Sequence, residues 1–378
     1  MREQSTRPLR ILAPTRYPWR FNSPRQSRHA ITNRPFLPMN KIDERIEGFT
    51  MFPPSLRKYD LVHAFNRIPI GRKPYLIGFE SHLPRGFSLE STAYFRALTK
   101  SLAGKRCRGI VAISRFSEQI FRKMHAGSDM ADALYEKLEM RYPNLEIPAI
   151  EDPAPDLDAP LQLVFVGHHF ARKGGCVAVR LAELAQEAGV DMRITIVSGL
   201  AMGGDIWTDP AREDYYETWV DRLERGNITH YRSLPNDQVQ TLLRAAHFCL
   251  LPTFGDTFGY SAIEAMANYC PMIATHQGAL PEFIEDDRNG ILLELPVDSD
   301  GHWIHSSSPD RATPGFERMF TDEIERLASS ALTRIVGYLN DPSSYRALRR
   351  EARRTVENTF AAKDANVFWD RRYEEAVG

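Results

Sequence analysis

Short apolar runs alternate with stretches of helical sequence along the first part of the chain. Four of these runs indicate strands, at residues 9–15, 59–65, 74–80 and 109–115. The last run leads into a predicted helix at residues 116–125. This alternation is typical of a parallel sheet whose strands are joined by helices. Ligands of such sheets bind at the carboxyl ends of the strands. Four side chains lie at or just after those ends: His63, His82, Ser114 and Arg115.

A second series of the same kind begins after residues 147–160, where four prolines and four acidic residues without periodicity indicate a linker. The strands predicted beyond it cover residues 161–168, 192–199, 228–234, 247–253 and 271–278. The helices predicted there cover residues 174–189 and 236–246, the second with Asn236 as its cap. The pattern predicts two doubly wound α/β domains in tandem, residues 1–155 and 156–355, with a ligand site in a cleft between them.

The remainder of the chain departs from this alternation. Residues 297–320 are polar and interrupted, so we expect a surface insertion there. The sequence that follows is helical and highly charged. It contains Trp369 and Tyr373, which we expect to dock the last helix onto the body of the protein.

The composition is that of a globular chain, with 43% hydrophobic and 26% charged residues, and 378 residues fit two domains better than one. The net charge of −1 creates no overall field that favours nucleic acid. The four cysteines are far apart without C-x-x-C spacing, which predicts reduced thiols and neither a disulfide framework nor a zinc site. We find no apolar run long enough to span a membrane and no secretory signal, and therefore expect a cytoplasmic protein.

Basic residues are concentrated in two stretches. Residues 1–40 hold eight arginines and one acidic residue, and residues 85–123 hold nine basic residues against two acidic ones. Apolar side chains between these charges, among them Phe87 and Phe95, are compatible with peripheral contact with anionic lipid on the inner face of the cell membrane. A site for a phosphate-bearing or acidic acceptor and a solvated basic helix are the alternatives.

The most distinctive chemistry lies in residues 252–290. Asp256 and Glu264 are eight positions apart, the first in a predicted loop and the second on a helix expected to begin near Tyr260. Glycines in the loop would let its backbone approach a ligand, and the first turn of the helix suits a phosphate or an oxyanion. Glu264 is better suited to accept hydrogen bonds from a diol such as ribose. Solvated helix charges beside a tight turn are the alternative.

A second segment, residues 164–175, connects a predicted strand that ends at Gly167 to a helix that begins near Gly174. Its basic loop places Arg172 and Lys173 at the start of that helix, where the helix dipole disfavours a cation. An anion bound between the cation and the helix would resolve this conflict. An exposed basic loop is the alternative.

Together these segments resemble the retaining, nucleotide-sugar-dependent glycosyltransferases of family 4, which have the GT-B fold. The resemblance is strongest over residues 161–292, weaker over 55–125 and in the final helices, and nearly absent over 1–50. Its central motif is a carboxylate, seven residues and a glutamate, with Phe-Gly inside and "EAMA" at the end (256–267), followed by "PMIAT" and "GALPEFIEDDRNGILL". The resemblance implies two Rossmann-like domains facing a central cleft, with a C-terminal helix, 356–378, that returns towards the first domain.

The resemblance also implies how the second domain would hold its donor. Glu264 would bind the ribose of the nucleotide, and Asp256 would contact hydroxyl groups of the transferred sugar. The backbone of Phe258, Gly259 and Tyr260 would lie against the sugar and the diphosphate.

The basic loop would act at the other end of the bond that breaks. Lys173 would neutralise the diphosphate leaving group, and Gly167, His168 and Arg172 would complete the donor-binding loop. His82 would face the reacting sugar from the first domain. The implied catalytic residues are therefore His82, Lys173 and Asp256. No metal or other cofactor is implied, and the donor would be linked to UDP or GDP.

The implied reaction moves a sugar from a nucleoside-diphosphate sugar to a glycan, lipid-linked or small-molecule acceptor, with retention of configuration, in polysaccharide or glycoconjugate biosynthesis. This sequence departs from the family at three single positions: Asp256 replaces a glutamate, His168 an arginine and Tyr269 a glycine. In addition, residues 15–29 replace a glycine-rich loop. These departures keep open the alternative of a catalytically silent GT-B protein that binds a nucleotide or a partner as a scaffold.

A phosphorylase-like or synthase member of the same fold is the alternative among enzymes. A nucleotide-linked dehydrogenase is disfavoured because neither domain begins with strand and G-x-G-x-x-G.

Overall fold

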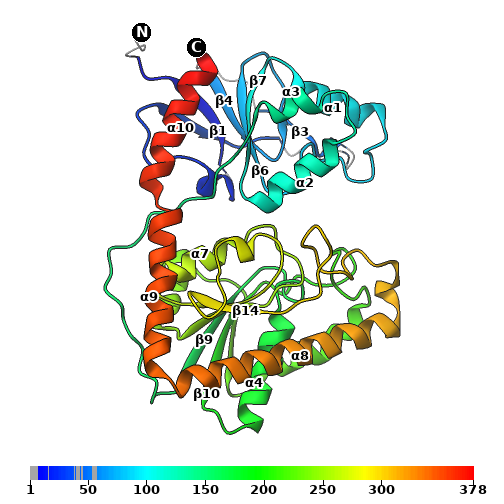
Figure 1. Ribbon diagram of the computed structural model, residues 1–378. Coiled ribbons are helices and arrows are strands. Elements are labelled where there is room, and N and C mark those ends of the chain that lie inside the picture. The colour runs from blue at the N-terminus through cyan, green and yellow to red at the C-terminus, as the bar shows by residue number, and fades with distance from the viewer. Residues whose placement is uncertain (1–6, 16, 38, 40–42, 44–45, 53–57) are drawn as a thin grey trace. The chain divides into compact units, whose positions relative to one another are not determined.

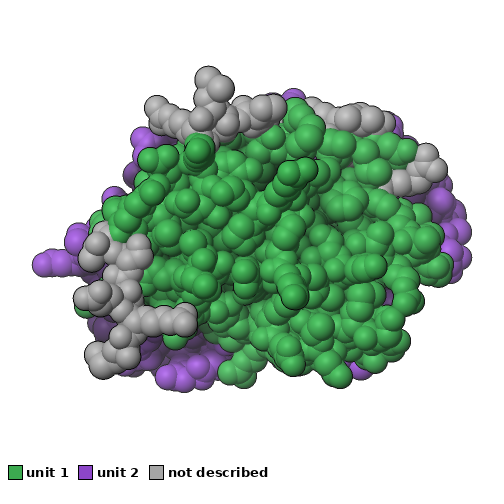
Figure 2. Space-filling view, turned by 90° about the horizontal axis from the view of Figure 1, so that it is seen from above, with its two compact units in different colours: residues 1–146, 360–378 green, residues 147–359 purple. Residues whose placement is uncertain are grey.

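The computed structural model describes residues 7–15, 17–37, 39, 43, 46–52 and 58–378. The chain divides into two compact units, shown in green and purple in Figure 2. Unit 1 comprises residues 1–146 and 360–378, and unit 2 comprises residues 147–359. Each unit is built on a parallel sheet (Figure 1), as the alternation of apolar runs predicts.

In the part of unit 1 that the structure describes, six strands form a parallel sheet in the order β2-β1-β4-β6-β7-β8. Their bounds are β1 (Arg10–Pro14), β2 (Ala30–Arg34), β4 (Leu61–Phe65), β6 (Tyr75–Phe79), β7 (Cys107–Ala112) and β8 (Leu138–Met140). Two further strands pair separately, β3 (Phe49–Thr50) and β5 (Ile68–Pro69). The helices are η1 (Trp19–Asn22), α1 (Ala93–Ala103), α2 (Arg115–His125), α3 (Ala131–Tyr135) and α10 (Ala362–Val377).

Successive residues of these strands face opposite sides of the sheet, because side chains alternate along a strand. Leu12 and Val62 pack into a core with the helices α1 and α2, whereas their neighbours Ile11 and Leu61 pack against α10. Trp369 and Tyr373 of α10 are almost fully buried in this second layer. The predicted return of the C-terminal helix to the first sheet is therefore confirmed.

Two of the residues predicted at the ligand-binding ends of the first sheet, His63 and Ser114, have structural roles instead. His63 is fully buried, its Nδ1 atom lies 2.8 Å from the Tyr373 hydroxyl, and burial lowers its pKa to about 3. Its imidazole is therefore a neutral partner of the last helix. Ser114 is the N-cap of α2, and its hydroxyl accepts a hydrogen bond from the backbone N–H of Ser117 at 3.0 Å.

The sequence that replaces a glycine-rich loop after β1 is built firmly into unit 1. Trp19 and Phe21 are buried. The Nδ2 atom of Asn144 donates to the carbonyl of Phe21 at 3.0 Å, and the side-chain oxygen of Asn366 accepts from the backbone N–H of Arg25 at 2.8 Å. This loop is therefore attached to α10 and to the segment after β8.

In the described residues of unit 2, six strands form a parallel sheet in the order β11-β10-β9-β12-β13-β14. Their bounds are β9 (Leu161–Val166), β10 (Met192–Val197), β11 (Ile228–Tyr231), β12 (Phe248–Leu251), β13 (Met272–Thr275) and β14 (Gly290–Leu293). The α-helices are α4 (Gly175–Glu187), α5 (Glu217–Asp221), α6 (Asn236–Ala245), α7 (Tyr260–Met266), α8 (Pro314–Leu339) and α9 (Pro342–Thr359). Short 3-10 helices are η4 (Glu213–Tyr216), η5 (Arg222–Glu224), η6 (Leu280–Glu282) and η7 (Pro309–Ala312).

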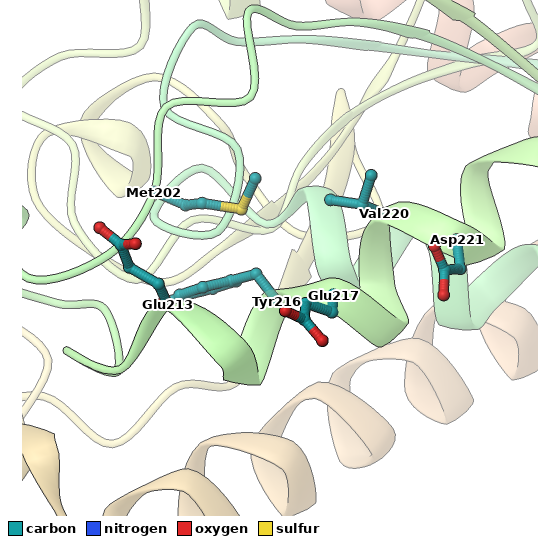
Figure 3. A pocket seen from close by; sticks show the side chains of 6 residues that line it. All are labelled: Met202, Glu213, Tyr216, Glu217, Val220 and Asp221. Atoms are coloured by element: carbon teal, nitrogen blue, oxygen red, sulfur yellow. The ribbon is translucent and has the colours of Figure 1, made fainter.

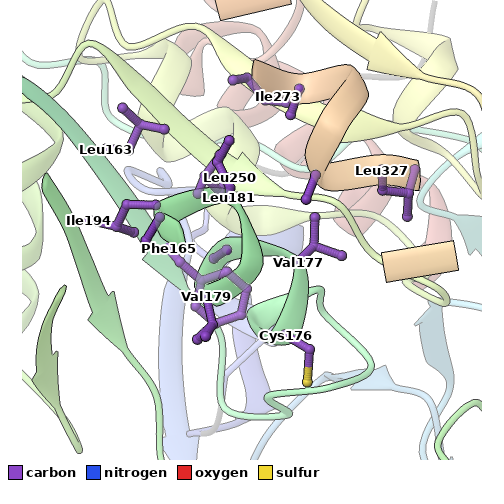
Figure 4. Packing of buried hydrophobic residues seen from close by; sticks show 14 of the residues in the cluster. Leu163, Phe165, Cys176, Val177, Val179, Leu181, Ile194, Leu250, Ile273 and Leu327 are labelled. Carbon is purple, nitrogen blue, oxygen red and sulfur yellow. The ribbon is translucent and has the colours of Figure 1, made fainter. Parts of the chain in front are cut away.

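The core of unit 2 lies between the sheet and the helices α4 and α8, which lie on the opposite side of the sheet from α7 (Figure 1). Phe165 and Ile194 of the strands meet Val177 and Leu181 of α4 in this core (Figure 4). The four cysteines of the chain are free and buried, as predicted.

The proline-rich segment expected to be a linker is bound to unit 2 near its start. The guanidinium of Arg349, itself fully buried, lies 2.8 Å from the Asp152 carboxylate. Arg353 donates to the carbonyl of Pro148 at 2.8 Å. The first unit therefore ends at residue 146, ahead of the expected boundary at 155.

The expected surface insertion at residues 297–320 is wrong in part. Trp303 is 1% exposed, and its ring lies 4.9 Å from that of Phe254. Phe316 and Phe320 belong to α8, which begins at Pro314 with the hydroxyl of Thr313 as its cap. The polar composition of this segment concealed three aromatic anchors of the core.

Among the described residues, no helix combines the length and the apolar character that crossing a membrane requires.

Candidate functional site

The strand order of unit 2 defines where a ligand can bind. From β9, at the centre of the sheet, the chain moves outward through β10 to β11, then crosses back and continues through β12, β13 and β14. The carboxyl ends of β9 and β12 therefore border a topological switch point, where open parallel sheets bind ligands. The basic loop after β9 and the "TFGDTFG" loop after β12 both begin at this point.

These two loops are joined through backbone and side-chain contacts. The carbonyl of Arg172 accepts hydrogen bonds from the Thr253 hydroxyl at 2.9 Å and from the backbone N–H of Phe254 at 2.8 Å. The Arg172 guanidinium donates to the carbonyl of Gly255 at 2.9 Å. Gly174 lies so close to the second loop that an added Cβ would be 2.2 Å from the carbonyl oxygen of Pro252.

Lys173 and Asp256, predicted separately from the two loops, form an ion pair. The Nζ atom lies 2.7 Å from Oδ2, with side chains that are 19% and 9% exposed. Burial alone would raise the pKa of Asp256, but Lys173, Arg172 and the backbone N–H of Phe258 lower it below its usual value. The carboxylate therefore compensates the cation at the start of α4.

The position of Asp256 is fixed by a residue that the sequence did not single out. The side-chain oxygen of Gln277 accepts from the backbone N–H of Asp256 at 2.9 Å, and its Nε2 donates to the carbonyl of the same residue at 3.3 Å. Gln277 follows β13 and is 1% exposed. The sequence feature that could have indicated this role is its position, since Gln277 is a polar residue at the carboxyl end of a predicted strand.

Glu264 lies on α7 and faces the start of α6. Its Oε1 atom accepts from Asn236 Nδ2 at 3.4 Å and from Gln240 Nε2 at 3.5 Å. The prediction that Asn236 caps its helix is wrong, because α6 begins at this residue and Pro235 occupies the N-cap position without a side-chain bond. The asparagine side chain contributes to the site instead.

The Phe-Gly turn between the two carboxylates presents backbone to the site. Phe258 is fully buried, and its ring stacks on that of Phe283 with centroids 5.3 Å apart. Gly259 has a φ of +84°, and an added Cβ would lie 2.6 Å from a methyl of Leu280. Tyr260 is 6% exposed and begins α7, as predicted. The side chain of Phe258 is core, so only its backbone is available to a ligand.

The basic loop contains two neighbouring histidines with different surroundings. Gly167 leaves room for the stem of Lys173, since an added Cβ would lie 2.8 Å from its Cδ. His168 is exposed. The sequence did not single out His169, whose buried Nδ1 atom has no hydrogen-bond partner within the described part of the chain. Burial and the charges of Arg172, His168 and Lys173 lower the pKa of His169 to about 4, so its ring is neutral at pH 7.

His82 lies in the loop after β6 of unit 1, with its ring 5.3 Å from that of Phe87. It belongs to the other unit from Lys173 and Asp256, and its role towards the reacting sugar stays a prediction.

Tyr269, which replaces a family glycine, keeps the backbone conformation that a glycine favours. Its φ is +59°, in the left-handed region. The Arg353 guanidinium lies over its ring at 5.1 Å. Tyr269 therefore adopts a backbone conformation that is unfavourable for a bulky residue, while its ring packs against Arg353.

The loop that follows β10 brings a buried carboxyl close to the site. Asp209 is fully buried and accepts hydrogen bonds from the Thr208 hydroxyl at 2.8 Å and from the backbone N–H of Gly203 at 3.3 Å. Burial raises the pKa of Asp209 to about 7, although these bonds and the charges of Arg172 and Arg311 act in the opposite direction. Cys176 and Tyr216 also interact electrostatically with this carboxyl.

Asp209→Asn should weaken the pH dependence of unfolding. Because folding raises the pKa of Asp209, its contribution to stability is complete below its unfolded pKa, near pH 4, and is lost as the pH rises through about 7. Between pH 5 and pH 8 the wild type should lose on the order of 2–3 kcal/mol relative to the variant. Urea unfolding at both pH values measures this, and a difference that does not change with pH would contradict it.

A pocket of about 490 Å³ lies elsewhere in unit 2, beside η4 and α5 (Figure 3). It is lined by Met202, Glu213, Tyr216, Glu217, Val220 and Asp221. Three carboxylates disfavour a phosphate ligand, and the pocket shares no lining residue with the two loops. The switch point and the hydrogen-bonded loops therefore define the candidate site. Nowhere in the described ranges do three or more His, Cys, Asp or Glu side chains gather as a metal site would require.

Comparison with known proteins assigns the part of unit 2 that contains the two joined loops to a family. Residues 160–301 match the family model described as glycosyl transferases group 1. This segment contains β9 to β14 and every predicted site residue of unit 2. These residues therefore form a glycosyl transferases group 1 domain, which confirms the resemblance seen in the sequence.

Solved structures show that the GT-B fold extends over both units. HepE from Anabaena, in complex with UDP-glucose, is similar with a TM-score of 0.59 at 12% identity, over 97% of this chain and 99% of that chain. Sucrose-phosphate synthase from Thermosynechococcus elongatus is similar with a TM-score of 0.54 at 18% identity, over 84% of this chain and 73% of that chain. At these identities the similarity shows the fold, which confirms the predicted fold class.

Curated relatives match a shorter region. The D-inositol 3-phosphate glycosyltransferase of Corynebacterium kroppenstedtii is 28% identical over 143 residues, which are 37% of this chain and 31% of that protein. The protein of the same name from Pseudarthrobacter chlorophenolicus is 27% identical over 207 residues, 54% of this chain and 44% of that protein. The chain thus aligns with less than half of the length of these relatives.

Proposed function

We propose that the protein is a retaining glycosyltransferase of family 4, which moves a sugar from a nucleoside-diphosphate sugar to an acceptor. The observation that carries the proposal is the Lys173–Asp256 ion pair, joined across two loops at the switch point of a glycosyl transferases group 1 domain. It provides a cation for the leaving diphosphate beside a carboxylate for the hydroxyl groups of the transferred sugar.

The proposed chemistry follows from the charge that develops as the bond to the anomeric carbon breaks. Negative charge grows on the diphosphate, and a fixed cation beside it lowers the barrier. An ammonium group has three donors, and Asp256 uses one of those of Lys173, so the others can bind phosphate oxygens. The nearby charge of Arg172 adds to this field, and we therefore expect transfer without a metal.

The donor would extend from this pair to Glu264. The Glu264 carboxylate is held beside Asn236 and Gln240, and these three side chains can together accept from and donate to the ribose diol. A UDP-linked donor is favoured, because two neighbours of the same fold are described as complexes with UDP-glucose and with UDP and GlcNAc. A GDP-linked donor is the alternative.

The acceptor side belongs to unit 1. We propose that His82 faces the reacting sugar there, and that a glycan, lipid-linked or phosphate-bearing small-molecule acceptor binds to this unit. Its basic residues, among them Arg96 and Arg115, are suited to a phosphate or to the anionic inner face of the cell membrane. A cytoplasmic protein of polysaccharide or glycoconjugate biosynthesis would fit these properties. Liposome sedimentation that is unaffected by anionic lipid would exclude the membrane contact.

Thermal unfolding with UDP, GDP, ADP and CMP tests the donor site. At 100 times its dissociation constant a nucleotide that binds the folded protein adds about 2.7 kcal/mol. We expect UDP to stabilise the wild type and to have a much smaller effect on Glu264→Ala, because the ribose loses its carboxylate.

Glu224→Ala is the matched control, since this carboxylate is exposed on η5 and outside the site. It should respond to UDP as the wild type does. A response in all three proteins would remove Glu264 from the donor site. Stabilisation by a nucleotide without release of nucleoside diphosphate from any nucleotide sugar would instead support the silent scaffold.

A further inference from the structure

One tryptophan of unit 2 is exposed at the edge of the proposed donor site. Trp207, in the loop between β10 and η4, is 44% exposed, whereas the other tryptophans of the chain are nearly buried: Trp19, Trp219, Trp303 and Trp369. Single exposed apolar side chains are common on protein surfaces, so exposure alone assigns no role. The contacts of this ring are more informative.

The indole of Trp207 lies against both loops of the site. The Arg172 guanidinium lies over its ring at 4.7 Å. A Cβ added to Gly255 would lie 3.4 Å from its Nε1 atom, so the glycine backbone passes close to the ring. Arg172 and Gly255 directly precede Lys173 and Asp256, the ion pair assigned to the diphosphate and the sugar.

The loop that carries this ring is held in place by the segment between β14 and α8. The Arg311 guanidinium donates to the carbonyls of Asp209 at 3.0 Å and Gly204 at 3.1 Å, one on each side of Trp207. The backbone N–H of Ser307 donates to the carbonyl of Trp207 itself at 2.7 Å. An aromatic ring on a constrained backbone loses little conformational entropy when it contacts a ligand.

We propose that Trp207 is a specificity-determining residue that covers an apolar C–H face of the transferred sugar, and that Arg311 positions it. This assignment rests on the proposed glycosyltransferase function. The ring is adjacent to the loop of Asp256, whereas the carboxylate assigned to the ribose faces α6. A sugar presents C–H groups between its hydroxyls, which an aromatic face can cover while Asp256 binds the hydroxyls.

Acrylamide quenching of intrinsic fluorescence tests the contact, because acrylamide reaches Trp207 more readily than the buried tryptophans. UDP-glucose should reduce the quenching of the wild type by at least twofold, and UDP alone should change it little. Trp207→Phe should lack the ligand-dependent change. Equal protection by UDP would place the ring over the nucleotide and overturn the proposal, as would bound UDP-glucose that gives no protection.

Thermal unfolding with the same two ligands separates the failure of this assignment from failure of the proposed function. If neither UDP-glucose nor any of UDP, GDP, ADP and CMP stabilises the wild type, the donor site itself is refuted, and Trp207 with it. If GDP stabilises it and the two uridine ligands do not, the assignment of Trp207 to the sugar of UDP-glucose is refuted. If both stabilise it and quenching is unchanged, only the assignment of Trp207 is refuted.

Kinetics provide a second test that a purely structural role would not pass. Trp207→Ala should lower kcat/KM for UDP-glucose about tenfold, the size expected for one aromatic contact, while the inhibition constant of UDP stays within twofold. Trp207→Phe should recover most of the loss. Arg311→Met should reproduce part of it, again without weakening UDP. Parallel losses in UDP-glucose turnover and UDP affinity would overturn the proposal.

Discussion

Lys173→Ala should lower kcat for sugar transfer by a factor of about 10²–10³, the loss expected when one fixed group that stabilises developing charge is removed. The ammonium is 2.7 Å from Asp256 and only 19% exposed, so it acts in a partly desolvated environment. Charge on the leaving diphosphate grows towards the transition state, and the effect should therefore fall on kcat more than on KM. Single-turnover rates at saturating donor measure it.

The same substitution leaves Asp256 with less compensation, and a control must separate this effect from catalysis. The Asp256 side chain is 9% exposed, and loss of its partner should cost about 1–3 kcal/mol of stability. Lys173→Ala combined with Asp256→Asn removes the uncompensated charge and should recover much of that stability without recovering kcat. A single Lys173→Ala variant that keeps kcat and raises only KM would refute the assignment to the leaving group.

Lys173→Arg should not restore the rate, and the composition of unit 2 gives a reason. Residues 147–359 contain one lysine, Lys173, and eighteen arginines. A compact ammonium with freely rotating donors can bind Asp256 and a phosphate oxygen together, whereas a planar guanidinium fixes the directions of its donors. The next residue, Gly174, also leaves little room for a shift of the loop, since even an added Cβ would overlap the carbonyl oxygen of Pro252 at 2.2 Å. The lysine of unit 2 therefore lies at the proposed site, whereas the other long basic side chains of the unit are arginines.

The sequence predicted the strands and the two loops of this site because both depend on local patterns. Apolar runs and their polar ends indicated β9 and β12, and the motif from Asp256 to Glu264 marked the second loop. The pairing of Lys173 with Asp256 was not predictable, since it depends on β12 lying beside β9 rather than beside its neighbour in the chain, β11. Strand order is a tertiary property that alternation alone does not contain.

The side chains missed by sequence analysis lie where local periodicity is absent. Trp207 and Asp209 belong to a long loop after β10 without helical or strand spacing. Residues 297–320 have a polar composition that indicated a surface insertion, yet Trp303 is in the core and Arg311 holds the Trp207 loop. The polar composition indicated an exposed segment. Its structural role depends instead on two residues, the buried Trp303 and Arg311, which composition does not distinguish.

Gly174→Ala should destabilise the protein by about 3 kcal/mol or more and abolish most donor binding. The backbone of Gly174 has a φ of +89°, a region that costs an L-residue about 1–2 kcal/mol. A Cβ there would also lie 2.2 Å from the carbonyl oxygen of Pro252 and 2.6 Å from its Cγ, far inside van der Waals contact. The loop after β12 would have to move away, and with it Asp256.

Gly189→Ala provides the matched control at the other end of the same helix. Gly189 follows α4 with a φ of +70°, and an added Cβ would meet nothing within 4 Å. This variant should lose only the conformational contribution, about 1–2 kcal/mol, and should bind UDP as the wild type does. Urea unfolding and UDP titration of both variants separate strain from steric overlap. If the two variants lose the same stability and the same affinity, the close approach of the two loops does not hold the donor site together.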